Sequence, residues 1–209
     1  SDAAANELEL AGLIAAGQAG EAEMLIVGSE AILRNDLSAS AVIALMNRVK
    51  AAVPGVPVAY ADTYATLLAH PELITASDVV LVNYYPYWEG VDVGSAMAYV
   101  HTRHQQALAA AQGKAVIVAE TGWPSAGNTI GSAVPSADNA SAYFLNFVSW
   151  ARANNVGYFY FEGLDEAWKA VNEGPQGAYW GVWDKDGDLK NGMSTVFDGS
   201  DQTATAIAA

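Results

Sequence analysis

Three glutamates, Glu30, Glu120 and Glu162, each come directly after a short apolar run. A carboxyl group in such a position lies at the mouth of a buried strand, where enzymes built on parallel barrels place their catalytic groups. A protonated carboxyl can donate a proton, and an ionised one can accept a proton or attack an electron-poor carbon. Cleavage of a glycosidic bond needs one carboxyl group in each state. The pattern therefore favours acid–base or covalent chemistry on a neutral, hydroxyl-rich substrate.

Aromatic side chains accompany these glutamates. Trp123 follows Glu120 on a stiff turn between Gly122 and Pro124, and a ring beside a carboxylate can stack on a pyranose and shift a pKa. A second cluster ends another apolar run at residues 83–88, Asn83-Tyr84-Tyr85-Pro86-Tyr87-Trp88. Its proline and its polar neighbours favour a loop that lines a cleft over a place in the core.

Two further segments end apolar runs with polar groups. One carries Tyr60, Asp62 and Thr63, and the other follows Glu162 with Asp165, Glu166, Trp168 and Lys169. Both add hydrogen-bonding groups to the candidate site.

Simpler interpretations remain open for each carboxylate. Glu30 could be a helix N-cap, a loop carboxylate or the ion-pair partner of Arg34. Glu120 could be a solvated glutamate beside a core tryptophan, and Lys169 could form an ordinary helical ion pair with an acidic neighbour.

Other chemistries have little support in the sequence. His101 and His104 lack a third ligand for zinc, and the loop 184–188 lacks the glycine position and the final glutamate of a calcium loop. The chain holds no cysteine and no Gly-x-Ser-x-Gly elbow. We therefore expect neither a metal nor a cofactor, and we interpret 184–188 as a turn between short strands.

The elements that must position these groups alternate along the chain. Apolar runs of strand length occupy five segments: Met24–Gly28, Val56–Tyr60, Val79–Tyr84, Ala115–Ala119 and Gly157–Phe161. Helical spacing occupies four others: Asn6–Ala16, Ser38–Val53, Ser95–Ala111 and Asp138–Asn154, the last capped by Ser136 or Asp138. Uninterrupted apolar strands alternating with helices predict a parallel sheet covered on both faces.

A doubly wound sheet and a TIM (β/α)₈ barrel both fit this order. No glycine-rich phosphate loop follows a strand, which weakens the first, and the aromatic-rich segments after the strands favour the second. A closed barrel needs eight strands, so the five expected here make a partial one. We expect this partial catalytic barrel over residues 1–192 and a C-terminal tail over residues 193–209.

Composition limits the partners. The 209 residues include 23 acidic and 9 basic ones, giving a net charge of -14, which repels nucleic acid and anionic lipid. Hydrophobic residues make up 52% of the chain, enough for a sizeable core. No apolar run approaches the length of a membrane-spanning helix.

Four segments together resemble glycoside hydrolase family 17, the β-1,3-glucanases, from about Asn6 to Lys190. They are Gly28-Ser29-Glu30, residues 83–87, Glu120-Thr121-Gly122-Trp123-Pro124-Ser125, and Asp165-Glu166 with Lys169. The glutamate-to-serine string is the most specific of them. Phe161-Glu162 and Tyr179-Trp180-Gly181 are more similar to the microbial branch than to the plant one.

The resemblance implies a retaining double displacement on β-1,3-glucan. Glu30 matches the acid/base at the end of the fourth barrel strand, and Glu120 the nucleophile at the end of the seventh. Glu166 and Lys169 match supporting groups near the cleft. Four positions match residues that line subsites: Asn83, Tyr85, Tyr87 and Trp123. Ser29 departs from the asparagine that the family usually places there to bind the sugar 2-hydroxyl.

Family members carry three strand–helix units before the first one expected here. We therefore expect either self-association through open sheet edges or a missing N-terminal half-barrel. Secretion, or a periplasmic location, is expected by family analogy. Two alternatives remain: a β-1,3-glucanosyltransferase with the same glutamates, or an inactive glucan-binding fragment.

Overall fold

The computed structural model describes residues 2–197, which form two compact units. Unit 1 comprises residues 2–83 with 106–117, and unit 2 comprises residues 84–105 with 118–197. Four strands form one sheet in the order β1-β2-β3-β4, and the pairs β1–β2 and β2–β3 are parallel. Strands β3 and β4 begin in unit 1 and run on into unit 2.

The sheet strands carry the apolar runs of the sequence. Their bounds are β1 Leu25–Ser29, β2 Val58–Thr63, β3 Val80–Tyr84 and β4 Val116–Thr121. Their register is irregular at one place: Ile26 pairs with Ala59, but Ser29 pairs with Ala61, so β1 uses one residue more than β2. Gly28 lies in this bulge with φ +97°, a backbone conformation that favours glycine. The bulge immediately precedes Glu30.

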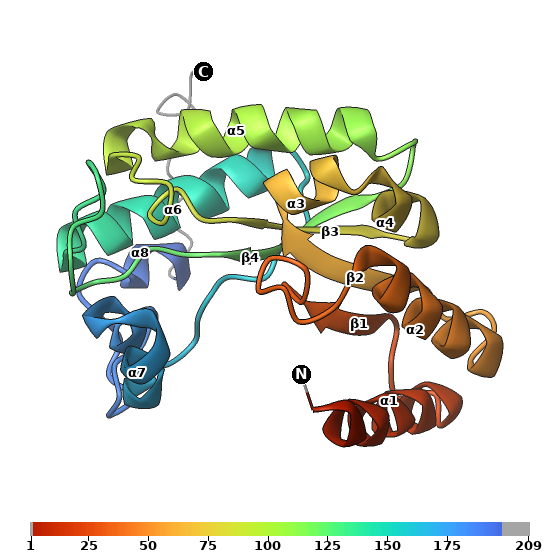
Figure 1. Ribbon diagram of the computed structural model, residues 1–209. Coiled ribbons are helices and arrows are strands. Elements are labelled where there is room, and N and C mark those ends of the chain that lie inside the picture. The colour runs from red at the N-terminus through yellow and green to blue at the C-terminus, as the bar shows by residue number, and fades with distance from the viewer. Residues whose placement is uncertain (1, 198–209) are drawn as a thin grey trace. The chain divides into compact units, whose positions relative to one another are not determined.

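Four helices belong to unit 1: α1 Ala3–Gln18, α2 Ala39–Ala52, α3 Tyr64–Ala69 and α4 Pro71–Ala76. The helix α2 lies along β1 and β2, as Figure 1 shows, and buries Val42, Met46 and Val49. Ser38 caps it by accepting a hydrogen bond from the Ala41 amide. The periodic apolar face and the cap thus define the helix that the sequence predicts.

In contrast, α1 buries only Leu10 and Gly17. A Cβ on Gly17 would lie 2.8 Å from a Leu25 methyl group and 2.9 Å from a Val53 methyl group, so glycine permits this close approach.

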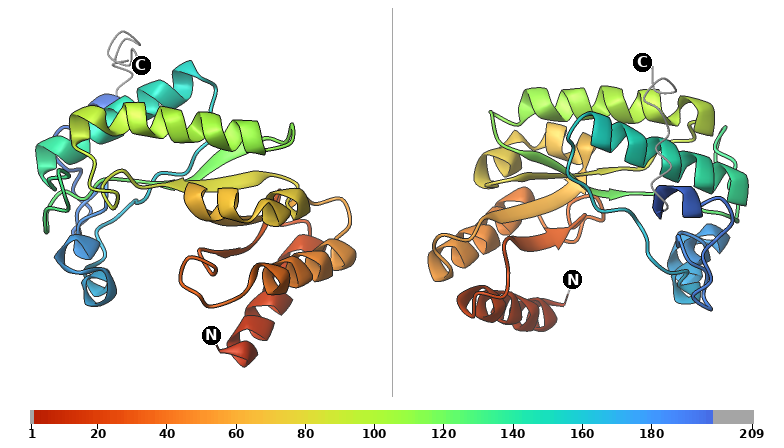
Figure 2. Two further views of the ribbon diagram at one scale, coloured as in Figure 1. Left: turned by 45° about the horizontal axis from the view of Figure 1, so that its top comes forward. Right: turned by 180° about the vertical axis from the view of Figure 1, so that it is seen from behind.

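Unit 2 is built around aromatic side chains. It holds α6 Ala137–Ala153 and the first part of α5 Val93–Ala110, whose residues from 106 on belong to unit 1. The two helices run side by side (Figure 2), and Trp150 of α6 contacts the rings of His101 and His104. Of the two caps expected for α6, Ser136 is the one that accepts a hydrogen bond, from the Asn139 amide. The remaining elements are short: η1 Ala167–Lys169, α7 Ala170–Glu173, η2 Pro175–Ala178 and α8 Ser194–Phe197.

The expected fifth strand is the main correction. Within residues 157–161, only an isolated parallel bridge joins Tyr158 to Val118. Phe159 donates its amide to Val118 O, but Phe161 donates to Thr121 O, so β4 advances three residues where its neighbour advances two. This slip prevents a regular ladder.

Other differences are smaller. The four expected helices are present, but α3 and α4 are additional, because helices of six residues leave too short a pattern to predict. The expected turn at 184–188 is present, closed by an antiparallel bridge between Trp183 and Leu189. Of the expected tail, residues 198–209 lie outside the described part. Within residues 2–197, no helix has both the length and the apolar character needed to cross a membrane.

Candidate active site

Glu30 is the first residue after β1, and hydrogen bonds from Glu30 itself and from the loop that follows it fix its place in unit 1. Its amide donates to Ala61 O on β2 at 2.9 Å. Its Oε1 accepts a hydrogen bond from Nδ2 of Asn83, at the end of β3, at 2.8 Å. Tyr60 Oη accepts from the amide of Ile32, two residues further on, at 3.0 Å. Parallel pairing of β1, β2 and β3 therefore brings together Glu30, Tyr60 and Asn83, which the sequence singled out separately.

Tyr60 is only 1% exposed, so its hydroxyl is engaged within the protein. Besides accepting from Ile32, it donates to Asp62 Oδ2 at 2.6 Å. Burial raises the pKa of Tyr60, with the Asp62 carboxylate acting in the same direction, so the phenol stays protonated.

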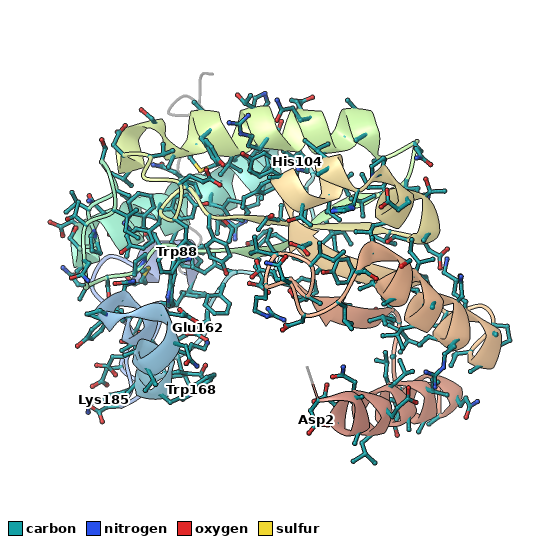
Figure 3. All side chains as sticks on the ribbon, viewed as in Figure 1. Asp2, Trp88, His104, Glu162, Trp168 and Lys185 are labelled. Carbon is teal, nitrogen blue, oxygen red and sulfur yellow. The ribbon has the colours of Figure 1, made fainter. Side chains whose placement is uncertain are left out.

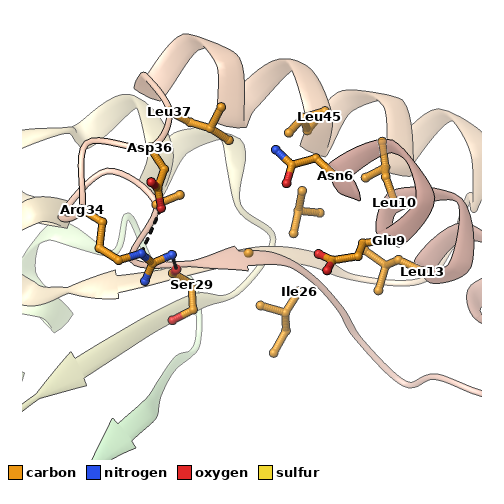
Figure 4. Close-up of a pocket in the computed structure, with 13 residues that line it drawn as sticks. Asn6, Glu9, Leu10, Leu13, Ile26, Ser29, Arg34, Asp36, Leu37 and Leu45 are labelled. Carbon is orange, nitrogen blue, oxygen red and sulfur yellow. Dashed lines mark hydrogen bonds and ion pairs between the residues drawn. The ribbon is translucent and has the colours of Figure 1, made fainter. Parts of the chain in front are cut away.

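Ser29 lies beside a cavity of about 420 Å³ between α1, β1 and the start of α2 (Figure 4). Most of the lining is apolar, from Leu10, Leu13, Ile26, Leu37 and Leu45. Arg34 crosses one end, donating to Ser29 O and pairing with Asp36 at 2.9 Å. The ion pair of Arg34 therefore goes to Asp36 rather than to Glu30.

Glu120 occupies the penultimate position of β4, in unit 2, and is partly exposed. Its Oε2 accepts a hydrogen bond from the Tyr85 hydroxyl at 2.9 Å. The Tyr85 ring stands edge-on to Phe161 and Trp180, which fix its direction. The neighbouring Thr121 is buried, and its hydroxyl donates to Tyr84 O at 2.8 Å. The glutamate is thus held by the strand below it and the tyrosine beside it.

Tyr87 and Trp123, both expected in the cleft, are packed inside unit 2. Tyr87 is fully buried, donates its hydroxyl to Asn128 O, and stands edge-on to Trp123 and Trp180. Trp123 is 1% exposed and donates its indole N–H to Val134 O at 3.2 Å. Trp88, by contrast, is 39% exposed and contacts Trp180.

Lys169 joins two of the predicted carboxylates. Its ammonium group pairs with Glu162 and, at 2.6 Å, with Glu166, and it lies 4.3 Å from the centre of the Phe161 ring. Burial raises the pKa of Glu162 to about 7, against the opposing effect of Lys169. Its Oε1 is buried without a hydrogen-bond partner among the described residues. Figure 3 shows Glu162 beside the short helices at the end of unit 2, with Trp168 exposed nearby.

Asp165, also expected in the site, has a different set of partners. Its Oδ1 accepts from the Lys190 ammonium at 2.6 Å and from the Gly181 amide at 2.9 Å. Lys190 also donates to Ser125 Oγ at 2.8 Å, so the pair ties the loop after β4 to residues 165 and 181.

Sequence reasoning passed over Glu173. It lies on α7 and accepts a hydrogen bond from the Trp180 indole at 3.1 Å. Burial raises its pKa, Lys169 opposes the shift, and the negative charges of Glu120 and Glu166 add to it. The one local signal was its position four residues after Lys169, which an ordinary helical ion pair would also give. Within residues 2–197, no group of His, Asp and Glu side chains could hold a metal ion.

The sequence of this chain is similar to those of known proteins. The glucan 1,3-beta-glucosidase of Candida albicans is 33% identical over 84% of this chain and 64% of its own length. That of Saccharomyces cerevisiae is 33% identical over 82% of this chain and 62% of its own length. The chain thus spans less than two thirds of these relatives.

Solved structures agree. The glycoside hydrolase family 17 beta-1,3-glucanosyltransferase of Rhizomucor miehei superposes with a TM-score of 0.75, at 32% identity, over 82% of this chain and 63% of that one. An active-site mutant of that enzyme was solved in complex with laminaritriose. The endo-laminarinase of Formosa, at 20% identity and a TM-score of 0.62, shares the fold. With its parallel sheet, the chain therefore has a TIM-barrel-like α/β fold, as expected.

The family model of the BtgE/BtgC glycoside hydrolase domain matches residues 1–181, most of the chain. This match and the similarity to the fungal glucosidases and glucanosyltransferase lead to one conclusion: the chain belongs to the BtgE/BtgC glycoside hydrolases, within glycoside hydrolase family 17.

Proposed function

We propose that this chain belongs to an enzyme that cleaves β-1,3-glucosidic bonds of a glucan such as laminarin by a retaining double displacement. The observation that carries the proposal is that two glutamates have the same kind of environment. Each lies at the carboxyl end of a strand and accepts a hydrogen bond from one neighbouring side chain. Glu30 follows β1 and accepts a hydrogen bond from Asn83, while Glu120 is the penultimate residue of β4 and accepts one from Tyr85. Barrel enzymes build their sites from such strand ends.

In the proposed reaction, Glu120 attacks the anomeric carbon while Glu30 gives its proton to the departing glycosidic oxygen. A covalent glucosyl ester on Glu120 results. Glu30, now ionised, then takes a proton from the incoming hydroxyl as that oxygen displaces Glu120 from the anomeric carbon. This route requires the two carboxyl groups about 5–5.5 Å apart in the working enzyme.

The incoming hydroxyl decides between two activities. Water gives hydrolysis, and a sugar hydroxyl gives glucanosyl transfer. The similar fungal proteins include both glucan 1,3-beta-glucosidases and a glucanosyltransferase. We favour hydrolysis as the main activity. Products longer than the starting laminari-oligosaccharide would instead identify transfer.

The remaining predicted residues take supporting roles in this proposal. Tyr85 orients the nucleophile. The network of Glu162, Glu166 and Lys169 supplies hydrogen-bonding groups to the glucan. Ser29, with its short side chain, leaves room for water at the sugar 2-hydroxyl. Three residues with buried side chains support the residues that line the cleft and do not contact the glucan themselves: Tyr87, Trp123 and Asp165.

We further propose that β1 to β4 are the fourth to seventh strands of a (β/α)₈ barrel and that residues 157–161 lie in the place of the eighth. Ile26 of β1 is 39% exposed, and the cavity beside it is lined by leucines together with Glu9, Arg34 and Asp36. In this proposal a complementary N-terminal half-barrel covers this edge, and a second copy of the chain is the alternative occupant. Light scattering of the purified chain separates a stable monomer from a dimer. A polysaccharide substrate also favours secretion.

The test uses Glu30→Ala and Glu120→Ala, with Glu23→Ala as a control for an exposed glutamate. We expect the release of reducing ends from laminarin to fall by about 10²- to 10⁴-fold in Glu30→Ala and at least as far in Glu120→Ala. Azide cannot protonate a sugar leaving group, so its effect is measured on an aryl β-glucoside with an acidic phenol. On that substrate, added azide should restore turnover, giving a β-glucosyl azide with Glu30→Ala and an α-glucosyl azide with Glu120→Ala.

Activity that survives Glu120→Ala would exclude it as the nucleophile. Glucan binding without any release of reducing ends by the unmodified chain would support the inactive glucan-binding fragment instead.

A further inference from the structure

The loop that carries Glu30 is anchored to strand β2 by a hydrogen bond to a buried tyrosine, Tyr60. Tyr60 makes two hydrogen bonds through one hydroxyl, to Asp62 Oδ2 at 2.6 Å and from the Ile32 amide at 3.0 Å. Tyr60 is 1% exposed and Asp62 fully buried. Neither side chain is open to a substrate, so both bonds serve the protein itself.

The direction of the two bonds follows from the groups involved. A carboxylate only accepts and a backbone amide only donates. The single phenolic proton must therefore point at Asp62, which leaves an oxygen lone pair for Ile32. The other Asp62 oxygen accepts from the Thr63 amide at 2.7 Å, which fixes the carboxylate on β2. In this series of hydrogen bonds from Ile32 through Tyr60 to Asp62, each donor has an acceptor. The direction of each bond is therefore fixed.

Glu30 needs this support because its backbone is strained. Its φ is +53°, a left-handed conformation that residues with a Cβ rarely adopt. It follows the bulge at Gly28, where the Tyr60 ring lies 3.8 Å from the position of a Cβ. The Ala61 carbonyl holds the Glu30 amide on one side, and the Tyr60 hydroxyl holds the next turn of the loop on the other.

We propose that Tyr60 and Asp62 are positioning residues that fix the Glu30 carboxyl group for proton donation to the leaving oxygen. This inference rests on the proposed function of Glu30. It changes the expectation for Tyr60, which sequence analysis treated as a substrate-binding residue.

The first test measures the hydrogen bond between the Ile32 amide and the Tyr60 hydroxyl, and it needs no enzymatic turnover. Tyr60→Phe keeps the ring and removes only the hydroxyl, and Tyr158→Phe is the matched control, since no hydrogen bond of its hydroxyl occurs among the described residues. Amide hydrogen exchange at Ile32 should be about 10-fold faster in Tyr60→Phe and unchanged in the control. Asp62→Ala should show the same effect at a smaller size. Unchanged exchange at Ile32 in both variants would overturn the proposal.

The second test separates positioning from general damage. A laminari-oligosaccharide needs a proton on its leaving oxygen, whereas an aryl β-glucoside with an acidic phenol does not. We expect kcat/KM of Tyr60→Phe to fall about 10- to 100-fold on the oligosaccharide and less than about 3-fold on the aryl glucoside. An equal loss on both substrates would mean that Tyr60 is merely structural.

Glu30→Gln serves as the reference for the proposed function itself. If Glu30→Gln shows the same dependence on the leaving group and Tyr60→Phe does not, the positioning role fails while the acid assignment stands. If Glu30→Gln shows no such dependence, the acid assignment fails, and the exchange at Ile32 still decides whether Tyr60 holds the loop.

Discussion

The side-chain amide of Asn83 donates a hydrogen bond to Glu30 Oε1 at 2.8 Å, although the two residues are 53 positions apart. Asn83 is 1% exposed, and its Oδ1 is buried without a partner among the described residues. A buried amide that satisfies only its donor costs stability. The Asn83 side chain is therefore placed to hold the carboxyl group of Glu30 rather than to satisfy itself.

Replacing Asn83 should therefore separate activity from stability. In Asn83→Leu, Glu30 Oε1 loses the hydrogen bond from Nδ2, while the buried unpaired oxygen of the asparagine also disappears. We expect kcat/KM on laminari-oligosaccharides to fall at least about 10-fold and the melting temperature to change by less than about 4 °C. Kinetics and calorimetry of the same preparation check this. A large drop in melting temperature with normal activity in the surviving fold would contradict it.

Tyr85→Phe tests the partner of Glu120. The change removes one hydrogen bond to a carboxylate, which contributes about 1.5–3 kcal/mol, and leaves the ring contacts in place. We expect kcat/KM to fall about 10- to 100-fold with the fold unaffected. Tyr179→Phe, on an exposed tyrosine, is the control and should keep full activity. Equal activity in both variants would remove Tyr85 from the site.

Glu162 should make stability depend on pH. Its pKa is 4.5 in the unfolded reference and about 7 in the folded protein, so the folded state holds the proton more tightly. The associated stability is full below about pH 4.5 and is lost as the pH rises through about 7. Glu162→Gln lacks this titration. The melting temperature of the unmodified protein should therefore fall more than that of Glu162→Gln across this window, and parallel curves would refute the assignment.

His104 should act in the opposite direction. Burial and the neighbouring His101 lower its pKa below 6.5, so the folded protein favours neutral imidazole. Its stabilising contribution is present above about pH 6.5 and is lost as the pH falls below that value. In addition, the Trp150 indole can only donate, so His101 Nδ1 accepts the hydrogen bond between them, at 3.3 Å.

The variant His104→Gln tests this. Between about pH 7 and about pH 5, the melting temperature of the unmodified protein should fall further than that of the variant. Differential scanning calorimetry over this range measures the difference, and identical slopes would rule out His104 as the cause.

The ion pair of Asp165 and Lys190 should be important for stability. The two side chains are 8% and 12% exposed, and Lys190→Met leaves the carboxylate buried without its cation. We expect the free energy of unfolding to fall by about 3 kcal/mol. Lys185→Met breaks the pair with Asp186, whose side chains are 70% and 65% exposed, and should leave the free energy of unfolding almost unchanged. Denaturant titrations of the two variants provide the comparison.

Local patterns in the sequence determined the strands, the long helices and the caps. Apolar runs of five or six residues predicted β1 to β4 within a few residues, and Ser136 or Asp138 marked the start of α6. The positions of Glu30 and Glu120 at strand ends followed from the same runs. These features depend only on residues close to one another in the sequence, so a single sequence is enough to predict them.

Tertiary structure decided which side chains contact and hydrogen-bond one another at the site. Strand register brings Asn83 to Glu30 and places Tyr60 beneath Ile32, and packing turns Trp123 and Tyr87 inward. A one-residue slip beside β4 keeps residues 157–161 from forming a strand that their composition predicts. The physical reason is that hydrogen bonds and burial depend on which segments meet in space, whereas periodicity records only which side of one segment is apolar.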